Sequence, residues 1–455
     1  MAQPGPAARA VPPGRRRTRP PAPYGDRMAG PPRRTARAGH PARPGHGGVR
    51  PGYRAAALVF AVGMAGATLP TPLYGLYRAE LGFSELTVTL VFAVYGLSVI
   101  GTLLFAGDLS DRFGRRPVLL LALGCSAASD LCFLLEGGLP LLYAGRAASG
   151  VSAGLLSGAA TAAVLELAPP GGEKRAGFAA TAANMGGLGC GPLLAGVLAQ
   201  YAPAPLRTPF LAHLALLALV VPLAAALPET VDRARRTDRA RPDHRRQDRR
   251  RERRPRERPR SVAVPPGVRG VFVPAATAAF TGFALLGLFT AVAPAFLSET
   301  LGERNHAVTG AVVFSVFLAS TLGQSLTGRL GVRRALPTGC LVLVAGLLLV
   351  GGSLAAESLP LLLAGALIGG FGQGLAFRAA LTSVGSAAPP AHRAATISAF
   401  FVVAYVGISL PIVGVGALSL PLGLRDAGML FTAVFTVAAL TVALLLARAP
   451  RAGKE

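Results

Sequence analysis

The chain has 455 residues, of which 52% are hydrophobic and only 15% charged, and its mean hydropathy is +0.50. Such a composition excludes an ordinary water-soluble enzyme of this length and is typical of integral membrane proteins. The formal net charge of +25 is concentrated in a few segments, so by itself it does not indicate a nucleic-acid partner.

Residues 1–52 are rich in proline, glycine, alanine and arginine, without the continuous apolar stretch that a signal peptide needs. We expect a disordered, basic cytoplasmic tail here, because this composition buries too little apolar surface to offset the entropy lost on ordering. Met28 is an alternative start to Met1, and the sequence leaves both open.

Twelve apolar runs follow, each of about 20 residues or more and therefore long enough to cross a bilayer as a helix. The first half, 53–228, is predicted to contain helices at 53–77, 84–107, 117–136, 139–168, 177–200 and 208–228. The second half, 270–447, is predicted to contain helices at 270–297, 307–329, 335–356, 359–388, 394–420 and 426–447. Short separators predict antiparallel neighbours, so we expect an all-α integral membrane protein made of two six-helix bundles.

An arginine-rich stretch over 229–269 separates the two halves and contains RRQDRRRERR at 245–254. We interpret it as a solvated cytoplasmic connector that also sets the topology. Contact with anionic lipid headgroups is an alternative, whereas RNA is not an expected partner because no aromatic residues accompany the charges. A short basic tail is expected at 448–455.

Lysine and arginine gather at alternate loops, which the positive-inside rule places in the cytoplasm. Besides the linker and tails, one side carries Arg112, Arg115, Arg116, Lys174, Arg175, Arg329, Arg333, Arg334 and Arg393. The opposite loops carry only Arg78, Arg207, Arg304 and Arg425. We therefore expect a multi-pass protein of the cell (plasma) membrane with both termini in the cytoplasm.

The only two lysines, Lys174 and Lys454, are not followed by serine or threonine, so the chain has no G-x-x-x-x-G-K-[ST] phosphate loop. A pump with its ATPase domain on this chain is excluded, and any transport must draw on gradients. The four cysteines all lie in apolar runs, where they are expected to pack as small hydrophobes. We predict no enzyme activity, cofactor or metal.

The segment between the second and third apolar runs, 107–117, reads GDLSDRFGRRP and packs charge and glycine into a short turn. Glycine at 107 and 114 allows sharp turns and close approach, and Asp111 lies near the start of the third helix, where partial positive charge favours a carboxylate. The pattern G-x-x-x-D-R-x-G-R-R at this place resembles the signature loop of the major facilitator superfamily of secondary transporters.

This resemblance implies a charge network between the loop and an acidic residue at the end of the fourth helix, where Glu166 stands. The network would act as a latch that holds the two halves in one state and releases them in the other. Its expected members are Gly107, Asp111, Arg112, Gly114, Arg115, Arg116 and Glu166. The alternative is charge that only sets topology, which explains the arginines but not the aspartate or the glycines.

The two halves share an internal repeat in their fourth helices. Residues 139–146 read LPLLYAGR and residues 359–366 read LPLLLAGA, at an offset of 220. The pairs Gly150 and Gly370, and Gly154 and Gly374, keep the same offset, as do the Ala-Pro-Pro segments at 168–170 and 388–390. A shared offset indicates a duplicated six-helix unit, although the second loop, 328–334, lacks the aspartates of the first.

Ionisable residues inside apolar runs are costly and are candidates for function. Asp130 and Arg146 reach a similar depth, so a pair between them is possible, either as a static neutral pair or as a proton and substrate site. Arg146 with Gly150 also resembles the R-x-x-x-G pattern of proton-coupled facilitators. Arg378 either contacts an anionic part of a substrate or extends toward the membrane surface, and His213 is expected to be structural.

The fifth run contains Gly187, Gly191, Pro192 and Gly196 and resembles the G-x-x-x-G-P-x-x-G-G motif of facilitator antiporters, with Ala195 in place of one glycine. Small residues at this spacing let helices approach closely, and proline bends the axis. The first run contains no acidic residue, unlike the first helix of several such exporters. Its LPTPLY segment at 69–74 is expected to kink and to line an outer gate.

Together these features predict a monomeric transporter that works by alternating access and exports a small amphipathic compound in exchange for protons. An importer or facilitative carrier is the alternative within the family. A membrane sensor or scaffold that does not transport, and acts through the basic linker, is the alternative from another class.

Overall fold

Apolar helices account for nearly all of the described structure, a computed structural model that covers residues 52–135, 137–231 and 264–448. Twelve stretches of these residues are long and apolar enough to cross a membrane, as the sequence predicts. The expected basic tails and most of the linker lie outside the described residues. All described residues belong to one contact unit that begins at Arg50.

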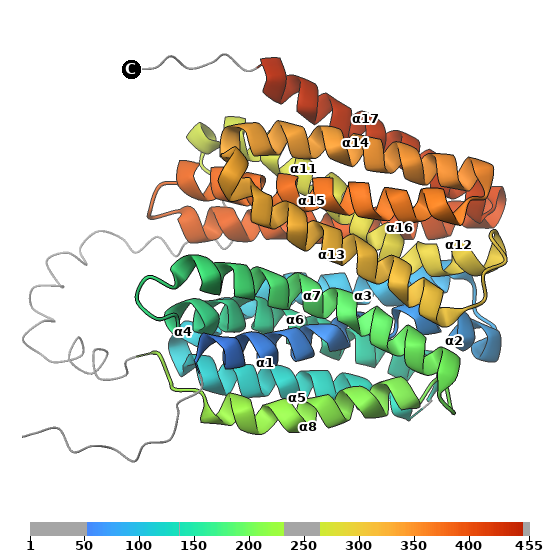
Figure 1. Cartoon of the computed structure of the whole chain (residues 1–455), viewed down its shortest axis with the longest axis horizontal. Coiled ribbons are helices and arrows are strands. Elements are labelled where there is room, and N and C mark those ends of the chain that lie inside the picture. Colours follow the sequence, from blue (N-terminus) through green and yellow to red (C-terminus); the bar gives the residue numbers. More distant parts are fainter. Residues whose placement is uncertain (1–51, 136, 232–263, 449–455) are drawn as a thin grey trace, which may run out of the picture. The chain divides into compact units, whose positions relative to one another are not determined.

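The first half contains six spans, the first of which is broken into three pieces. Its elements are α1 (Tyr53–Thr68), η1 (Thr71–Leu73), α2 (Tyr74–Leu81), α3 (Glu85–Ala106), the short α4 (Leu109–Phe113), α5 (Arg115–Leu134), α6 (Gly138–Glu166), α7 (Glu173–Tyr201) and α8 (Thr208–Ala226). In Figure 1 these helices are drawn in blue to green and lie side by side.

The second half repeats this arrangement with a broken first span. Its elements are η2 (Pro266–Val268), α11 (Arg269–Gly287), η3 (Leu288–Val292), α12 (Ala293–Glu299), α13 (His306–Leu330), α14 (Val332–Ala356), α15 (Leu359–Ala387), α16 (Arg393–Leu422) and α17 (Leu424–Arg448). These helices are drawn in yellow to red in Figure 1.

Proline explains why the first span of each half is broken, because it lacks an N–H and its ring clashes with the carbonyl four residues earlier. Pro70 and Pro72 turn the first span into the 3₁₀ segment η1, which confirms the kink predicted at 69–74. In the second half, Pro294 stands at the start of α12, directly after the π-helical segment η3. Such π-turns are frequent at functional sites.

The first span is longer than expected, since it ends at Leu81 rather than at residue 77. The prediction stopped before Arg78 because that residue is charged. The structure instead continues α2 until Gly82, whose φ of +68° ends the helix in the left-handed conformation that glycine adopts without strain. Arg78 is therefore a helix residue with a fixed orientation.

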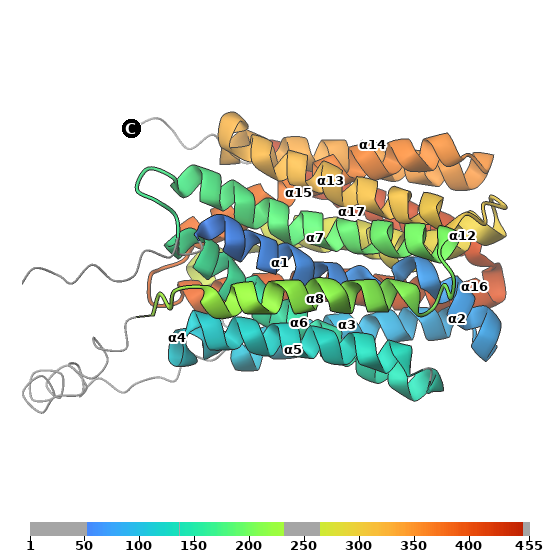
Figure 2. The ribbon, with the colours of Figure 1, turned by 60° about the horizontal axis from the view of Figure 1, so that its bottom comes forward.

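The two halves contact each other along two seams, α7 against α13 and α3 against α16. Figures 1 and 2 both show α7 and α13 as neighbours. Glycine makes the first seam close, because a Cβ on Gly196 would collide with the backbone carbonyl of His306, and a Cβ on Gly310 with that of Pro192. The halves thus meet backbone to backbone at the end of the helices that contains these residues.

We predict that Gly196→Ala destabilises the protein, because overpacking of a close contact costs about 1–3 kcal/mol. Gly186→Ala on the same helix is the matched control, since a Cβ there meets nothing within 4 Å. The melting temperature of the purified protein in detergent should fall for Gly196→Ala and stay level or rise for Gly186→Ala. Equal melting temperatures would contradict the close α7–α13 seam.

Candidate transport cavity

A cavity of about 420 Å³ lies between the two halves. Its walls come from α1, α3, α6 and α7 of the first half and from α11, η3, α13, α15 and α16 of the second. This volume falls within the range of about 300–1,000 Å³ that small-molecule sites occupy. The cavity is therefore large enough for a drug-sized compound.

The cavity extends toward one end of the helices. We call this the linker end, because the described linker residues Val231 and Val264 lie there. The other end is the distal end. The lining includes Leu165 in the last turn of α6, and Gly177 and Ile397 near the starts of α7 and α16. Toward the distal end the lining stops in the middle of the spans.

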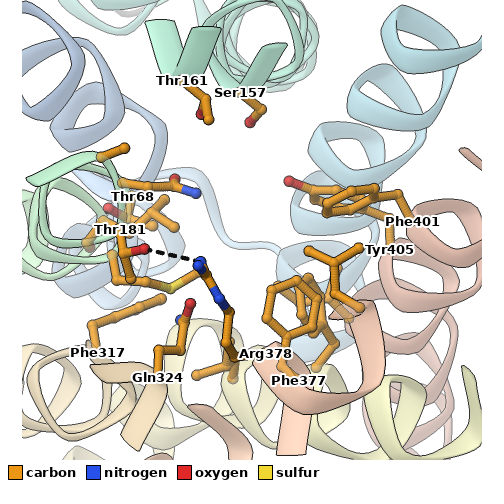
Figure 3. A pocket seen from close by; sticks show the side chains of 18 of the residues that line it. Thr68, Ser157, Thr161, Thr181, Phe317, Gln324, Phe377, Arg378, Phe401 and Tyr405 are labelled. Carbon is orange, nitrogen blue, oxygen red and sulfur yellow. Dashed lines mark hydrogen bonds between the residues drawn. The ribbon is translucent and has the colours of Figure 1, made fainter. Parts of the chain in front are cut away.

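Aromatic rings form much of the wall, including Phe92 and Tyr95 on α3 and Phe377 and Phe401 on α15 and α16. None of the residues that line this cavity in the described structure is a carboxylate. Its one guanidinium belongs to Arg378. Figure 3 shows this side chain reaching into the cavity, with Gln324 and Phe377 beside it.

Arg378 is exposed to the cavity, although it lies within a membrane span. Its Nη1 donates to the Thr181 hydroxyl across the cavity at 3.5 Å, which is long for a hydrogen bond. The Thr181 hydroxyl in turn donates to the carbonyl of Gly177 at 3.1 Å. Of the two sequence-based alternatives for Arg378, the structure places the side chain in the cavity rather than along the membrane surface.

Arg146 lies behind the aromatic wall and is only 1% exposed. Its guanidinium stands 4.6 Å from the ring centroid of Tyr95 and 5.4 Å from that of Phe92, and its Nη1 donates to the carbonyl of Ala67 at 2.7 Å. Gly150, one turn further along α6, packs closely on α3, since a Cβ there would meet the backbone of Tyr95. Cation–π contacts therefore accommodate this buried charge.

Asp130 pairs with His213 rather than with Arg146. The carboxylate Oδ2 lies 2.7 Å from His213 Nδ1, and His213 Nε2 lies 3.0 Å from the carbonyl oxygen of Val62. Both side chains are buried. The pair lies among α1, α5 and α8, and neither residue lines the cavity.

The geometry of this pair fixes how many protons it holds. The carbonyl of Val62 can only accept, so Nε2 of His213 must donate. One further proton then lies between Nδ1 and Asp130, which gives either an imidazolium with a carboxylate or a neutral imidazole with a carboxylic acid. Both forms are neutral overall, which suits a site away from water.

The charge network predicted at the α3–α5 loop is present, and all its described members lie in the first half. Arg115 lies 2.5 Å from Asp111 and 2.9 Å from Glu166, and it also donates to the Ser110 hydroxyl at 2.6 Å. Arg115 is thus the centre that joins α4, α5 and α6. Arg112 and Arg116 lie in the same loop.

Two residues that the sequence analysis missed complete this network. The carboxylate of Glu229 accepts from the backbone N–H groups of Arg115 at 2.9 Å and Arg116 at 3.2 Å, and so caps the start of α5. Thr230 donates to Glu166. Both residues follow directly after the sixth span. No motif distinguishes them in the sequence from the other residues of the charged linker.

The two glycines of the loop differ in backbone conformation. Gly107 lies in the turn that follows α3, with a helical φ of −55°, and a Cβ there would lie 2.8 Å from the carbonyl oxygen of Leu103. Gly114 has φ of +108°, and a Cβ at this position would collide with Glu229. The turn therefore depends on Gly114.

The glycines of the fifth-helix motif face two different neighbours. A Cβ on Gly187 would collide with the carbonyl of Ala61, and one on Gly191 with the carbonyl of Ala65, both on α1. Gly196 and Pro192 face α13 of the other half. The motif therefore packs α7 between α1 and α13, next to the cavity.

The halves are also joined at the distal end by side chains. Arg78 on α2 forms ion pairs with Glu85 of its own half and with Glu299 on α12 of the other half. The side-chain oxygen of Gln200 accepts from the backbone N–H of His306 at 2.9 Å. These contacts connect the two broken first spans and reinforce the α7–α13 seam.

A second, smaller cavity of about 130 Å³ lies next to the Arg78–Glu299 pair. The partition between the two cavities is thin. On α3, Val88 lines the distal cavity and Phe92, one turn away, lines the large one; on η3 the adjacent residues Ala291 and Thr290 do the same.

The sequence matches two models of transporter families. The Major Facilitator Superfamily model matches residues 56–321, and the Sugar (and other) transporter model matches residues 276–419. In the described residues, no group of three or more histidine, cysteine, aspartate or glutamate side chains is arranged to hold a metal ion.

Several curated relatives are bacterial resistance proteins. The chain is 32% identical to the class B tetracycline resistance protein of Escherichia coli over 143 residues, which cover 31% of this chain and 35% of the relative. It is 30% identical to multidrug resistance protein 2 of Bacillus subtilis over 149 residues, covering 33% and 36% of the two chains. The matches thus span about a third of each relative's length.

Solved structures share the fold over most of their length. A peptide transporter POT mutant in complex with sulfate gives a TM-score of 0.65 at 15% identity, covering 87% of this chain and 94% of that one. The human organic anion transporter TETRAN gives a TM-score of 0.58 at 18% identity, covering 86% and 98%. Because the family model matches more than half of the sequence and the twelve-helix fold agrees with it, the chain belongs to the Major Facilitator Superfamily.

Proposed function

We propose that this protein is a secondary active transporter that exports a small amphipathic compound by alternating access, in exchange for protons. One observation carries the proposal: a cavity lined by both halves extends to the linker end, while ion pairs and backbone seams join the halves at the distal end. This arrangement supports a binding site that is accessible from one side.

The accessible side is proposed to be the cytoplasm. Each described loop between spans at the linker end carries arginine, among them Arg112, Arg175, Arg333 and Arg393, and loops rich in such charges stay in the cytoplasm. A plasma-membrane exporter loads its substrate from that side. The protein is proposed to act as a monomer, since one chain supplies both halves of the cavity.

Opening the distal end requires α2 and α12 to separate, because Arg78 and Glu299 join them. Both helices follow a break in their span, η1 and η3, where the regular hydrogen-bond ladder is interrupted. Each can therefore tilt without bending the rest of its span. We infer that these two segments form the distal gate.

Export rather than import is supported by the relatives that are named as resistance proteins for tetracycline, several drugs and, in Staphylococcus aureus, quinolones. The match of the second half to the sugar transporter model keeps import or facilitated diffusion as the alternative. The non-transporting sensor rests on the linker, which lies outside the described residues.

Transport into inside-out vesicles, with a pH gradient imposed across the membrane, tests the direction and the coupling ion. A panel of cationic, neutral and anionic aromatic compounds should include at least one that accumulates only when the vesicle lumen is acidic. Accumulation that ignores the gradient would indicate a facilitative carrier. If no compound moves in either direction, the transporter proposal fails.

We expect Asp130→Asn to abolish accumulation driven by the pH gradient while leaving exchange at equal pH intact. The residues lining the described cavity include no carboxylate, which makes the Asp130–His213 pair the proposed proton carrier. Asparagine can still donate to a neutral His213, so the fold should persist. Glu357→Gln, which alters an exposed carboxylate paired with Arg425, is the control. Unchanged gradient-driven uptake in Asp130→Asn would remove Asp130 from the coupling pathway.

Glu299→Gln should loosen the distal gate, because it removes the ion pair between the halves and leaves the Arg78–Glu85 pair in place. We expect a membrane-impermeant maleimide to label a cysteine at position 295, in the distal cavity, about two to five times faster, as the loss of a partly exposed ion pair implies. Glu80→Gln on α2 is the control. Equal labelling rates in both variants would show that Glu299 does not hold the gate.

The network around Arg115 is proposed to hold the α3–α5 loop in position while the cavity faces the cytoplasm. Asp111→Ala should lower the transport rate about two- to fivefold, the effect of one weakened ion pair, with normal membrane insertion. Asp108→Ala in the same loop is the matched control, as its side chain does not cap α4. If both variants transport at the wild-type rate, the loop charges serve topology alone.

A further inference from the structure

Two arginines, one in the wall of the central cavity and one behind it, have no carboxylate partner among the described residues. Arg378 projects into the cavity, and its side chain donates a hydrogen bond to the Thr181 hydroxyl across it. Arg146 lies directly behind Tyr95 and Phe92, and its single hydrogen bond goes to the carbonyl of Ala67. Neither positive charge is neutralised by the described side chains that surround it.

The surroundings of these two arginines strengthen the electrostatic effect of their positive charges inside the cavity. Apolar and aromatic walls have a low dielectric constant, so a positive charge acts over a longer distance than in water. A cleft lined by charge of one sign concentrates the opposite ion. Because the lining contains Arg378 and no aspartate or glutamate, the field favours anions and disfavours cations.

The remaining lining determines what else the ligand needs. Rings from both halves, among them Tyr95, Phe317, Phe377 and Phe401, offer faces for stacking. The long 3.5 Å contact between Arg378 and Thr181 leaves the guanidinium able to exchange its partner for an oxyanion. A guanidinium binds carboxylates and similar groups with two parallel hydrogen bonds.

We propose that the cavity binds organic monoanions with an apolar aromatic body, and that Arg378 holds the anionic group while the rings hold the body. This rests on the proposed transport function, whose substrate class it names. The Thr181 hydroxyl faces Arg378 from the other half, and by turning its single O–H from the Gly177 carbonyl to the ligand it would let one anion contact both halves at once.

The charge of the ligand sets the electrical balance of the cycle. A monoanion that leaves the cell moves one negative charge outward, and a proton that enters moves one positive charge inward. Each exchange of one anion for one proton therefore moves two charges in the same electrical sense. A membrane potential that is negative inside drives this exchange, whereas one-for-one exchange of a monovalent cation for a proton is electroneutral.

Three probes of the same shape and different charge test the proposal: naphthoate, naphthamide and naphthylmethylammonium. Binding of each to the purified full-length protein would be measured at equilibrium. Naphthoate should bind at least about tenfold more tightly than naphthamide, as expected for hydrogen bonds to a charged group, and naphthylmethylammonium should bind most weakly. In inside-out vesicles, a lumen-positive potential should accelerate naphthoate uptake.

Arg378→Gln should remove the preference for naphthoate over naphthamide, while Arg378→Lys should keep part of it because the charge remains. Arg304→Gln removes one positive charge from an exposed loop at the distal end and should leave the preference unchanged. Equal binding of the three probes, tighter binding of the cation, a preference that survives Arg378→Gln, or no binding of any probe would each overturn the proposal.

The same measurements keep this proposal separate from the proposed function. If naphthylmethylammonium or naphthamide is transported across the vesicle membrane while naphthoate binds no more tightly than the other two probes, the protein is a transporter and the anion assignment is wrong. If naphthoate binds with the expected dependence on Arg378 but no probe crosses, the site is correct and the transport function is wrong.

Discussion

A charge inside a bilayer costs free energy unless it is paired, solvated or held by dipoles, and the interior of this protein follows from that constraint. Three spans carry such charges, and each charge meets the constraint differently. Asp130 shares a proton with His213, Arg146 lies against two rings and a backbone carbonyl, and Arg378 projects into a cavity between the halves. Of these three charges, only that of Arg378 is accessible to a ligand in the cavity.

The position of the cavity depends on where the backbones of the two halves approach. Glycine at 196 and 310 lets the backbones of α7 and α13 touch at the distal end. Any side chain at these two positions would push the halves apart. Toward the linker end, the space between the halves is the cavity, whose walls carry aromatic side chains.

Periodicity predicted the twelve spans. The resemblance of the 107–117 loop to a family motif implied a network of Asp111, one loop arginine and Glu166, and in the structure Arg115 is the arginine that contacts both carboxylates. The Asp130–His213 pair could not be predicted in the same way. Depth along a helix can be counted from the sequence, but which helix faces which depends on packing, and it is α8 rather than α6 that presents its polar side chain to Asp130.

The distal ion pair was missed for a related reason. Arg78 and Glu299 are 221 residues apart, and each lies in a short helix after a proline-induced break. A prediction that treats charged residues near the ends of apolar runs as loop residues places both outside the helices. The glycine at position 82 was the signal in the sequence that α2 continues beyond Arg78, because the helix ends there in a left-handed turn.

The charges of Asp130, Arg146 and Arg378 each occur in one half only, although the two halves are related by an internal repeat. At the offset of 220 that relates α6 to α15, Arg146 corresponds to Ala366, and Arg378 corresponds to Gly158. The partner of α5, α14, contains neither a carboxylate nor a histidine. The repeat thus gives the two halves a common scaffold, and each half carries a different set of charges within its membrane spans. The proposed proton pair lies in the first half, whereas the guanidinium of the proposed anion site comes from the second, so we expect movement of one half against the other to couple them.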